Sequence, residues 1–381
     1  MTCEASTKPR RFGGSLALPN HLNGTKFLHF MQNITSDLIT KLKSSQLRNS
    51  RVLIAGDLNF DIIDLLPRLP EVGEEIFITS RSRTLAGSAG IFTHAIGKLG
   101  GKANFIGKVG DDEGGRNLCE QLHRIGVNVD GVIRVPNGLT ATTYIYVDAA
   151  HPGQRLMITL RGVFDELDLR ELELGNYRDK VDVLHLCSYF VLPKLQPEIP
   201  RIIQQAKVLG FQVSFDANSG DGWNDQQTLE VFRHEIFPFV DYLFLNRYEA
   251  SAVTGQSQPY GMLDRLADWN PNGILTIKLD AEGSFSRFGT RTVHVDGFPC
   301  DHIQDTVGAG DTFDATFVHF HQKGFSIDDA AILANANARS TLEKAGGPTG
   351  QCTEADLIDL LSRYRVERIP QSDTIVRYQI K

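Results

Sequence analysis

Short apolar runs alternate with helix-like segments along most of the chain after residue 50. The first run, RVLIAGD at residues 51–57, predicts a buried β-strand that enters a tight turn. Further predicted strands lie at residues 104–107, 181–186, 211–216, 242–245 and 273–279, and predicted helices at 92–99, 114–125, 199–209, 229–237, 311–323 and 327–344. Strands separated by such helices form βαβ units, so this pattern predicts an α/β fold around a mainly parallel sheet that is covered on both faces.

Two segments depart from this rhythm. Residues 75–79 (EIFIT) and the stretches 141–148 and 155–160 alternate polar and apolar positions or lack intervening helices. Both features are typical of antiparallel strands with one wet face. We therefore expect a small β-sheet lid built from strands near residues 74–80 and 140–161. A sheet that protrudes in this way is also a candidate surface for a homodimer.

The ends of the chain differ from this central α/β domain, which we expect to span residues 51–365. Residues 366–381 are predicted to form a C-terminal tail. Residues 1–50 are predicted to be a largely helical extension, since a helix over about 27–46 would align apolar side chains on one face. These side chains are Leu28, Met31, Ile34, Leu38 and Leu42. The alternative is an organelle-targeting segment, because residues 1–36 hold four Lys or Arg and a single acid, Glu4.

Composition narrows the class of protein. The 381 residues are 41% hydrophobic and 22% charged, which is ordinary for a globular protein with a large core. A net charge of −7 argues against a nucleic-acid-binding surface. The five cysteines form no C-x-x-C pair, so we expect no disulfide framework or structural zinc site, and a reducing cytoplasm fits best. No run of about 18 apolar residues predicts a membrane span.

The richest chemistry lies at residues 305–313, DTVGAGDTF, directly before and within a predicted helix. Glycines let backbone N–H groups turn toward a ligand, and the helix N-terminus adds a positive dipole, so this turn predicts an anion site. Asp311 would repel that anion. It is better explained as a base that takes a proton from a hydroxyl attacking a phosphate. The alternative is a glycine-rich loop with Asp as a helix cap.

Polar side chains also follow several predicted strands, and ligands of α/β sheets bind at these carboxyl ends. They are Asp57, Asn59 and Asp61 after the first strand, Asp216 and Asn218 after a later one, and Asn246 and Glu249 after the next. Such groups suit sugar hydroxyls or hydrated Mg²⁺. Each pair taken alone is explained equally well by a helix cap or an Asx turn.

With these segments in view, the sequence resembles the ribokinase-like, phosphofructokinase-B family of sugar kinases over about residues 51–359. DTVGAGDTF closely matches the C-terminal signature of that family. The other resembling segments are Asn246-x-x-Glu249 (Mg²⁺ and phosphate motif), residues 56–61 (sugar contact), residues 216–218 (acidic turn) and residues 86–115 (N-terminal glycine-rich signature).

The resemblance implies a ribokinase-like three-layer sandwich and transfer of the γ-phosphoryl group of ATP to a hydroxyl of a sugar. It makes Asp311 the catalytic base and the backbone amides of Gly308, Ala309 and Gly310 the anion hole. The implied acceptor-binding residues are Asp57, Asn59, Asp61 and Gly87. The implied nucleotide-binding residues are Asn246, Glu249, Lys278, Gly283 and Asn335, with Asn335 near the adenine. The implied metal-site residues are Asp216 and Glu249 for Mg²⁺, and Asp305 for a monovalent cation such as K⁺.

Three positions depart from the family pattern. Ile91 stands where the family usually has an asparagine that touches the sugar, Gly220 stands where it often has an arginine, and Thr316 stands where it prefers Gly or Ala. These departures bear on the identity of the acceptor, and they leave the residues implied in phosphoryl transfer unchanged.

Alternative functions remain open at this point. A nucleoside kinase of the same fold would be served by Phe60, Phe92 and Tyr144, which could stack a base but are more often core residues. A catalytically silent regulatory protein is disfavoured, because such a protein needs no base in an anion pocket. The chain has neither a G-x-x-x-x-G-K-[ST] motif nor a strand followed by G-x-G-x-x-G and a helix. The sequence therefore argues against a P-loop ATPase and against a dinucleotide-binding fold.

Overall fold

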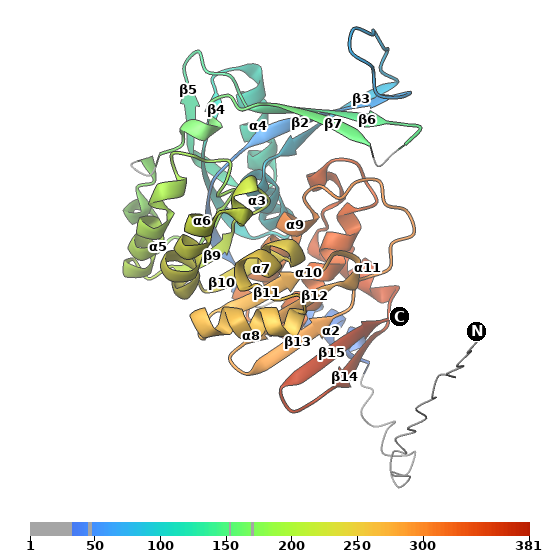
Figure 1. The fold of residues 1–381 in the computed structure, drawn as a ribbon. Helices are drawn as coiled ribbons and strands as arrows, with labels where there is room; N and C mark the ends of the chain where they lie inside the picture. The colour runs from blue at the N-terminus through green and yellow to red at the C-terminus, as the bar shows by residue number, and fades with distance from the viewer. Residues whose placement is uncertain (1–32, 45–47, 152–153, 169–170) are drawn as a thin grey trace, which may run out of the picture.

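The computed structural model describes residues 33–44, 48–151, 154–168 and 171–381. Within them, eleven strands form the main sheet in the order β14-β15-β13-β12-β11-β10-β9-β8-β1-β4-β5, and four form a second sheet, β3-β2-β6-β7 (Figure 1). The main-sheet strands are β1 (Arg51–Ala55), β4 (Lys102–Gly110), β5 (Asn128–Val135), β8 (Val183–Cys187), β9 (Gln212–Asp216), β10 (Tyr242–Asn246), β11 (Ile274–Lys278), β12 (Ser284–Phe288), β13 (Arg291–Val295), β14 (Val366–Pro370) and β15 (Ile375–Ile380).

Helices cover both faces of the main sheet (Figure 1). They are α2 (Ile34–Lys43), α3 (Ser88–Lys98), α4 (Glu113–Arg124), α5 (Ile199–Val208), α6 (Gln226–Val231), α7 (Arg247–Thr254), α8 (Pro259–Trp269), α9 (Ala309–Gln322), α10 (Ile327–Thr341) and α11 (Glu354–Ser362). Successive side chains of a strand point to opposite faces. Val52 and Ile54 of β1 accordingly pack with α3, α4, α9 and α10, while Leu53 and Ala55 pack with α5 to α8. The predicted three-layer α/β sandwich is confirmed.

The order of the strands creates a switch point between β1 and β8, which pair in parallel. From β1 the sheet grows in one direction through β4 and β5, and from β8 it grows in the other through β9, β10 and β11. The helices that follow these strands cover opposite faces of the sheet. The carboxyl ends of β1 and β8 lie at this switch point, which is where ligands of open α/β sheets bind.

The predicted lid is confirmed, although one of its strand assignments was wrong and two of its strands were missed. Its strands are β2 (Asn59–Leu66), β3 (Ser80–Ala86), β6 (Thr142–Asp148) and β7 (Arg155–Leu160). Residues 75–79 form no strand, and the apolar side chain of Phe77 is 80% exposed. Strand β2 was missed because Asp61 and Asp64 interrupt its apolar pattern. Asp64 is nonetheless buried, since Arg81 of the neighbouring strand donates two 2.7 Å hydrogen bonds to its carboxylate.

The first and the last elements of the described chain pack against each other. The predicted N-terminal helix appears as α2 in residues 34–43, while the rest of its predicted span lies mostly outside the described residues. The predicted C-terminal tail was wrong, because residues 366–380 form β14 and β15, and β15 extends the main sheet beside β13. The backbone N–H of Val366 donates to the hydroxyl of Thr35 in α2 over 2.8 Å. Leu38 and Leu42 of α2 are buried in the adjoining core.

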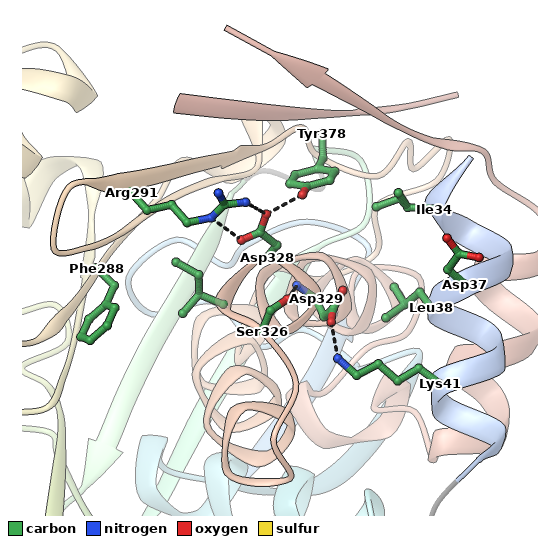
Figure 2. A pocket seen from close by; sticks show the side chains of 11 residues that line it. Ile34, Asp37, Leu38, Lys41, Phe288, Arg291, Ser326, Asp328, Asp329 and Tyr378 are labelled. Carbon is green, nitrogen blue, oxygen red and sulfur yellow. Dashed lines mark hydrogen bonds and ion pairs between the residues drawn. The ribbon is translucent and has the colours of Figure 1, made fainter. Parts of the chain in front are cut away.

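Figure 2 shows the cavity of about 460 Å³ where α2 meets the start of α10 and the β12–β13 hairpin. Its charged side chains are paired across the junction. Lys41 contacts Asp329 at 2.7 Å. Arg291 and the hydroxyl of Tyr378 both donate to Asp328. The Lys41–Asp329 pair and the buried leucines attach α2 to the rest of the fold. No helix in the described parts of the chain is long and apolar enough to cross a bilayer.

Replacing Leu38 by Ala is expected to destabilise the protein by about 2–4 kcal/mol, because it removes a side chain that is only 2% exposed and leaves a cavity. The matched control is Ser36→Ala at an exposed position of the same helix, which should change stability by less than about 0.5 kcal/mol. Thermal and denaturant unfolding measure both variants. Equal unfolding midpoints for Leu38→Ala and wild type would show that α2 is not part of the core.

Candidate active site

The glycine turn lies directly before helix α9. Gly308 is the N-terminal cap, with φ of +76°, and α9 begins at Ala309. A Cβ at Gly308 would lie 2.9 Å from Cδ1 of Ile91, so both the backbone angle and the close packing require glycine. The first N–H groups of a helix have no acceptor within it, and the dipole favours negative charge there. Gly308, Ala309 and Gly310 thus form a turn suited to an anion.

Asp311 lies in the first turn of α9, beside this anion-binding turn. Its Oδ1 accepts a 3.1 Å hydrogen bond from Nδ2 of Asn218, which follows β9. Burial, followed by the negative charge of Asp216, raises the pKa of Asp311 to about 7, although the charge of Lys278 acts in the opposite direction. A carboxylate that titrates near neutral pH is well matched to general-base work.

Lys278, at the end of β11, is held by two buried carboxylates. Its Nζ lies 2.6 Å from Asp216 and 2.9 Å from Asp314. Burial alone would lower the pKa of Lys278, but these two carboxylates outweigh it and raise the pKa, so the ammonium stays charged. A Cβ on Gly310 would stand 3.3 Å from Nζ. The predicted nucleotide-binding lysine therefore adjoins the anion-binding turn, while its charge is already balanced by protein groups.

Asp57 follows β1 and organises the start of α3. Its two oxygens accept hydrogen bonds of 3.1 Å from the backbone N–H groups of Ser88 and Ala89. Oδ1 also accepts a 2.6 Å bond from the hydroxyl of Ser188. Gly87 has φ of +86°, and a Cβ there would lie 2.7 Å from Oδ1 of Asn59. The structure thus brings Asp57, Asn59 and Gly87 together.

Asn59 and Asp61 lie in lid strand β2 and not in a loop after β1, which corrects their predicted setting. They share one face of the strand, because residues two apart point the same way. Asp61 lies opposite Thr84 of β3 and Thr143 of β6. Burial, followed by the charge of Asp305, raises the pKa of Asp61 to about 7. The lid therefore presents Asp61 toward the loop that precedes α9.

Asn246 and Glu249 form the capping box of α7. The side chain of Asn246 accepts from the N–H of Glu249 over 2.9 Å, and the two oxygens of Glu249 accept from Asn246 over 2.7 and 2.8 Å. Burial, followed by the charge of Asp216, raises the pKa of Glu249 to about 8. The capping alternative is therefore realised, and it places Glu249 beside Asp216 at the base of the site.

Asp305 is separate from Asp216 and Glu249. Its oxygens accept 3.0 Å hydrogen bonds from the backbone N–H groups of Val307 and Gly346, so protein hydrogen bonds already hold this loop. A K⁺ ion here stays a prediction of the resemblance. In the part of the chain that the structure describes, no three His, Cys, Asp or Glu side chains are grouped to hold a metal. A magnesium ion would therefore depend largely on phosphate oxygens and water, which is its usual coordination.

Gly283 and Asn335 meet at the junction of β12 and α10. Gly283 has φ of +90°, and a Cβ there would lie 2.0 Å from the carbonyl oxygen of Val295, so no side chain fits. Nδ2 of Asn335 donates to the hydroxyl of Ser284 over 2.7 Å. Gly283 lies in the β11–β12 connection that follows Lys278, and Asn335 of α10 contacts the neighbouring Ser284.

The positions that depart from the family pattern have structural reasons. Ile91 packs its side chain against Gly308 and Gly347. A Cβ at Gly220 would lie 2.4 Å from the ring of Phe190, so the aromatic ring fills the space of a longer side chain. Thr316 accepts a 2.8 Å hydrogen bond from Asn337 and thereby links α9 to α10.

Two polar residues of the site were not predicted from the sequence. Asp314 lies three residues after Asp311, on the same side of α9, and this helical spacing was a usable signal. Ser188 directly follows β8 and has φ of +59°. It carries no motif. Its place after a predicted strand, at the carboxyl edge of the sheet, was the only signal available.

The fold and the site together define an α/β protein with a glycine turn at a helix N-terminus, an adjacent buried carboxylate and a small second sheet. Residues 49–353 match the model of the pfkB family of carbohydrate kinases. The chain is 30% identical over 314 residues to an ATP-dependent ribose-1-phosphate kinase of Halopiger xanaduensis, covering 82% of this chain and 99% of that protein. The chain belongs to the pfkB carbohydrate kinase family.

Solved structures agree on the fold. The structure of Arabidopsis thaliana ribokinase complexed with ribose and ATP is similar, with a TM-score of 0.70 and 22% identity over 82% of this chain and 99% of that one. Adenosine kinase from Sinorhizobium meliloti has a TM-score of 0.66 and 23% identity over 79% of this chain and 96% of that one. The ribokinase-like fold expected from the sequence is confirmed.

If Asp311 accepts the proton of the acceptor, as the resemblance implies, kcat/KM for the acceptor should fall as the pH drops through about 7. The sign follows from the raised pKa, since a protonated Asp311 cannot take a further proton and protonation now sets in near neutral pH. Initial rates over a range of about pH 5.5 to 9 give this profile. A profile that stays flat down to about pH 5.5 would contradict the raised pKa of Asp311.

Proposed function

We propose that this protein is an ATP-dependent kinase that transfers the γ-phosphoryl group to a hydroxyl of a sugar or sugar-like small molecule. The observation that supports this most strongly is the position of Asp311. It lies in the first turn of α9, one residue beyond the glycine turn, and it is linked through Asn218 and Ser188 toward Asp57. A base between an anion site and a set of polar acceptor groups is the arrangement that phosphoryl transfer to an alcohol requires.

In this proposal, Asp311 takes the proton of the acceptor hydroxyl. The hydroxyl oxygen bonds to the γ-phosphorus of ATP, and the bond between that phosphorus and the oxygen that ADP keeps breaks. The N–H groups of the glycine turn stabilise the charge on the transferred group. Asn59 and Asp61 of the lid, with Asp57 behind them, orient the acceptor. Lys278 keeps Asp216 and Asp314 in place beside the turn. Asp216 and Glu249 would hold a Mg²⁺ ion through its bound water, and the ion would supply further neutralisation of the phosphate charge.

The positions of the three aromatic rings that could stack a nucleoside base favour a sugar acceptor over a nucleoside. Phe60 is 1% exposed, and the guanidinium of Arg83 lies 3.6 Å from the centre of its ring. Phe92 is buried and stacks on His185. Tyr144 pairs with Ile62 and so lies on the opposite face of the lid from Asp61. None of these three rings is placed to stack a base beside Asp311.

Asp311→Asn is expected to lower kcat by about 10²–10⁴-fold with little change in the KM for ATP, because the amide keeps the shape but cannot accept the proton. The matched control is Asp359→Asn, an exposed aspartate of α11, which should keep wild-type kinetics. ADP formation with sugars and nucleosides as acceptors provides the readout. Near wild-type kcat in Asp311→Asn would remove this residue as the base.

We also propose that two copies associate through the lid. Strand β7 is an edge strand, and all six of its residues are exposed. Its exposed apolar side chains are Leu156 (46%), Met157 (49%), Ile158 (54%) and Leu160 (43%). An uncovered edge strand with apolar residues on both faces is a template for pairing with another chain. A second β7 in antiparallel orientation would cover both its backbone groups and these side chains.

Ile158→Lys is therefore expected to shift the protein from dimer to monomer, because two ammonium groups would be brought together in the paired edge. Leu139→Lys is the matched control, since Leu139 is 57% exposed but lies outside β7. Light scattering coupled to size-exclusion chromatography measures the mass of each. A wild-type protein that is monomeric at micromolar concentration would rule out this association.

A further inference from the structure

Asn218 joins several parts of the site through hydrogen bonds on each of its polar groups. Its backbone N–H donates to Asp216 over 2.8 Å, and its carbonyl accepts from the indole of Trp223 over 3.0 Å. Its side-chain Oδ1 accepts from the backbone N–H of Ser188 over 2.8 Å. Its side-chain Nδ2 donates to Oδ1 of Asp311 over 3.1 Å. Only the last of these four bonds reaches the residue proposed as the base.

The orientation of this amide is determined by its partners. Because Ser188 contributes a backbone N–H, which can only donate, the atom facing it must be the amide oxygen. The NH₂ group must then face Asp311, whose carboxylate can accept. Asn218 has φ of +59°, a backbone conformation that Asn and Gly adopt more readily than most residues. The turn therefore fixes both the position of the side chain and the direction of its donor.

The same residue connects the base to the acceptor side. The hydroxyl of Ser188 donates to Asp57 over 2.6 Å, so a continuous path runs from Asp57 through Ser188 and Asn218 to Asp311. It crosses the carboxyl ends of β1, β8 and β9 before it reaches α9. These are the strands on either side of the switch point in the sheet. A side chain in this path sets where Asp311 lies relative to a bound acceptor.

We propose that Asn218 is a positioning residue for phosphoryl transfer, whose Nδ2 holds Oδ1 of Asp311 and so leaves Oδ2 to take the proton of the acceptor. This inference rests on the proposed function, in which Asp311 is the base. The side chain of Ser88 also donates to this carboxylate, and the bond from Asn218 adds a second restraint on its rotation about the Cβ–Cγ bond. A hydrogen bond at one oxygen restricts that rotation and keeps the second oxygen in a productive geometry.

A purely structural role makes a different prediction, because it uses only the backbone groups and Oδ1. Asn218→Asp keeps the acceptor for Ser188 and nearly the same shape, but it replaces the donor facing Asp311 by a carboxylate oxygen. Asn218→Gly keeps the positive φ without strain and removes the side chain. If Asn218 only supports the turn, the Gly variant should lose stability but keep the kcat of wild type, because the donor to Asp311 would not matter. If Asn218 positions the base, the Asp variant should be the less active.

The experiment compares kcat, the KM for ATP and the KM for the acceptor in wild type, Asn218→Gly and Asn218→Asp. The acceptor is the sugar or nucleoside that gives the highest rate with wild type. The positioning role predicts a loss of kcat of about tenfold for Gly and about a hundredfold for Asp, with the KM for ATP within about twofold of wild type. The larger loss for Asp arises because two carboxylates about 3 Å apart share a proton, which disables the base.

An Asp variant as active as the Gly variant or more active, or wild-type kcat in either, overturns the inference. Should the Gly variant fail to fold, the Asp variant carries the test alone, since it keeps the backbone bonds of the turn, and wild-type kcat there is decisive. Asp311→Asn separates this inference from the proposed function. If Asp311→Asn is inactive while the Asn218 variants keep the kcat of wild type, the assignment of Asp311 as the base is retained and only the positioning role of Asn218 is wrong. If it is active, the base assignment itself is wrong.

Discussion

One buried ammonium group balances the negative charge on which the whole site depends. Lys278 is 14% exposed and contacts Asp216 and Asp314, which are almost fully buried. Burial raises the pKa of Glu249 and of Asp311, and the charge of Lys278 opposes this rise in both. Carboxylates gathered in a poorly hydrated space repel one another strongly unless a cation is present. Lys278 thereby allows an aspartate base to lie near other acids and still ionise close to neutral pH.

The topology of the sheet explains why these groups converge. The chain leaves β1 and β8 in opposite directions, so the loops at their carboxyl ends are not covered by a crossing connection. Asp57 after β1 and Ser188 after β8 therefore meet in a direct hydrogen bond of 2.6 Å, and the turn after β9 brings Asn218 beside them. Helix α9 begins beside Asn218, and Asp61 of the lid lies near the loop that precedes α9. The proposed anion site, base and acceptor groups follow from this one arrangement.

Much of this could be predicted from the sequence, because the buried strands are continuous apolar runs and the helices have clear periodicity. The glycine turn with Asp311 could be predicted because glycine, helix start and acid are adjacent in the chain. Other features depend on partners distant in sequence. Strand β2 contains a buried aspartate, Asp64, whose charge is balanced by Arg81 of the neighbouring strand, and β14 and β15 are strands only because β13 offers an edge. The role of Lys278 likewise requires knowing that Asp216 and Asp314 surround it, 62 and 36 residues away.

The central claim is that the site phosphorylates a sugar hydroxyl with ATP. The most direct measurement is ³¹P NMR of reactions that contain the wild-type protein, Mg-ATP and single neutral sugars, sugar phosphates or nucleosides. The account predicts that, with a sugar or sugar-like acceptor, the γ-phosphate resonance of ATP is replaced by the resonances of ADP and of a new phosphate monoester on that acceptor. ATP consumption that no acceptor stimulates, or a phosphate monoester formed only on nucleosides, would contradict it.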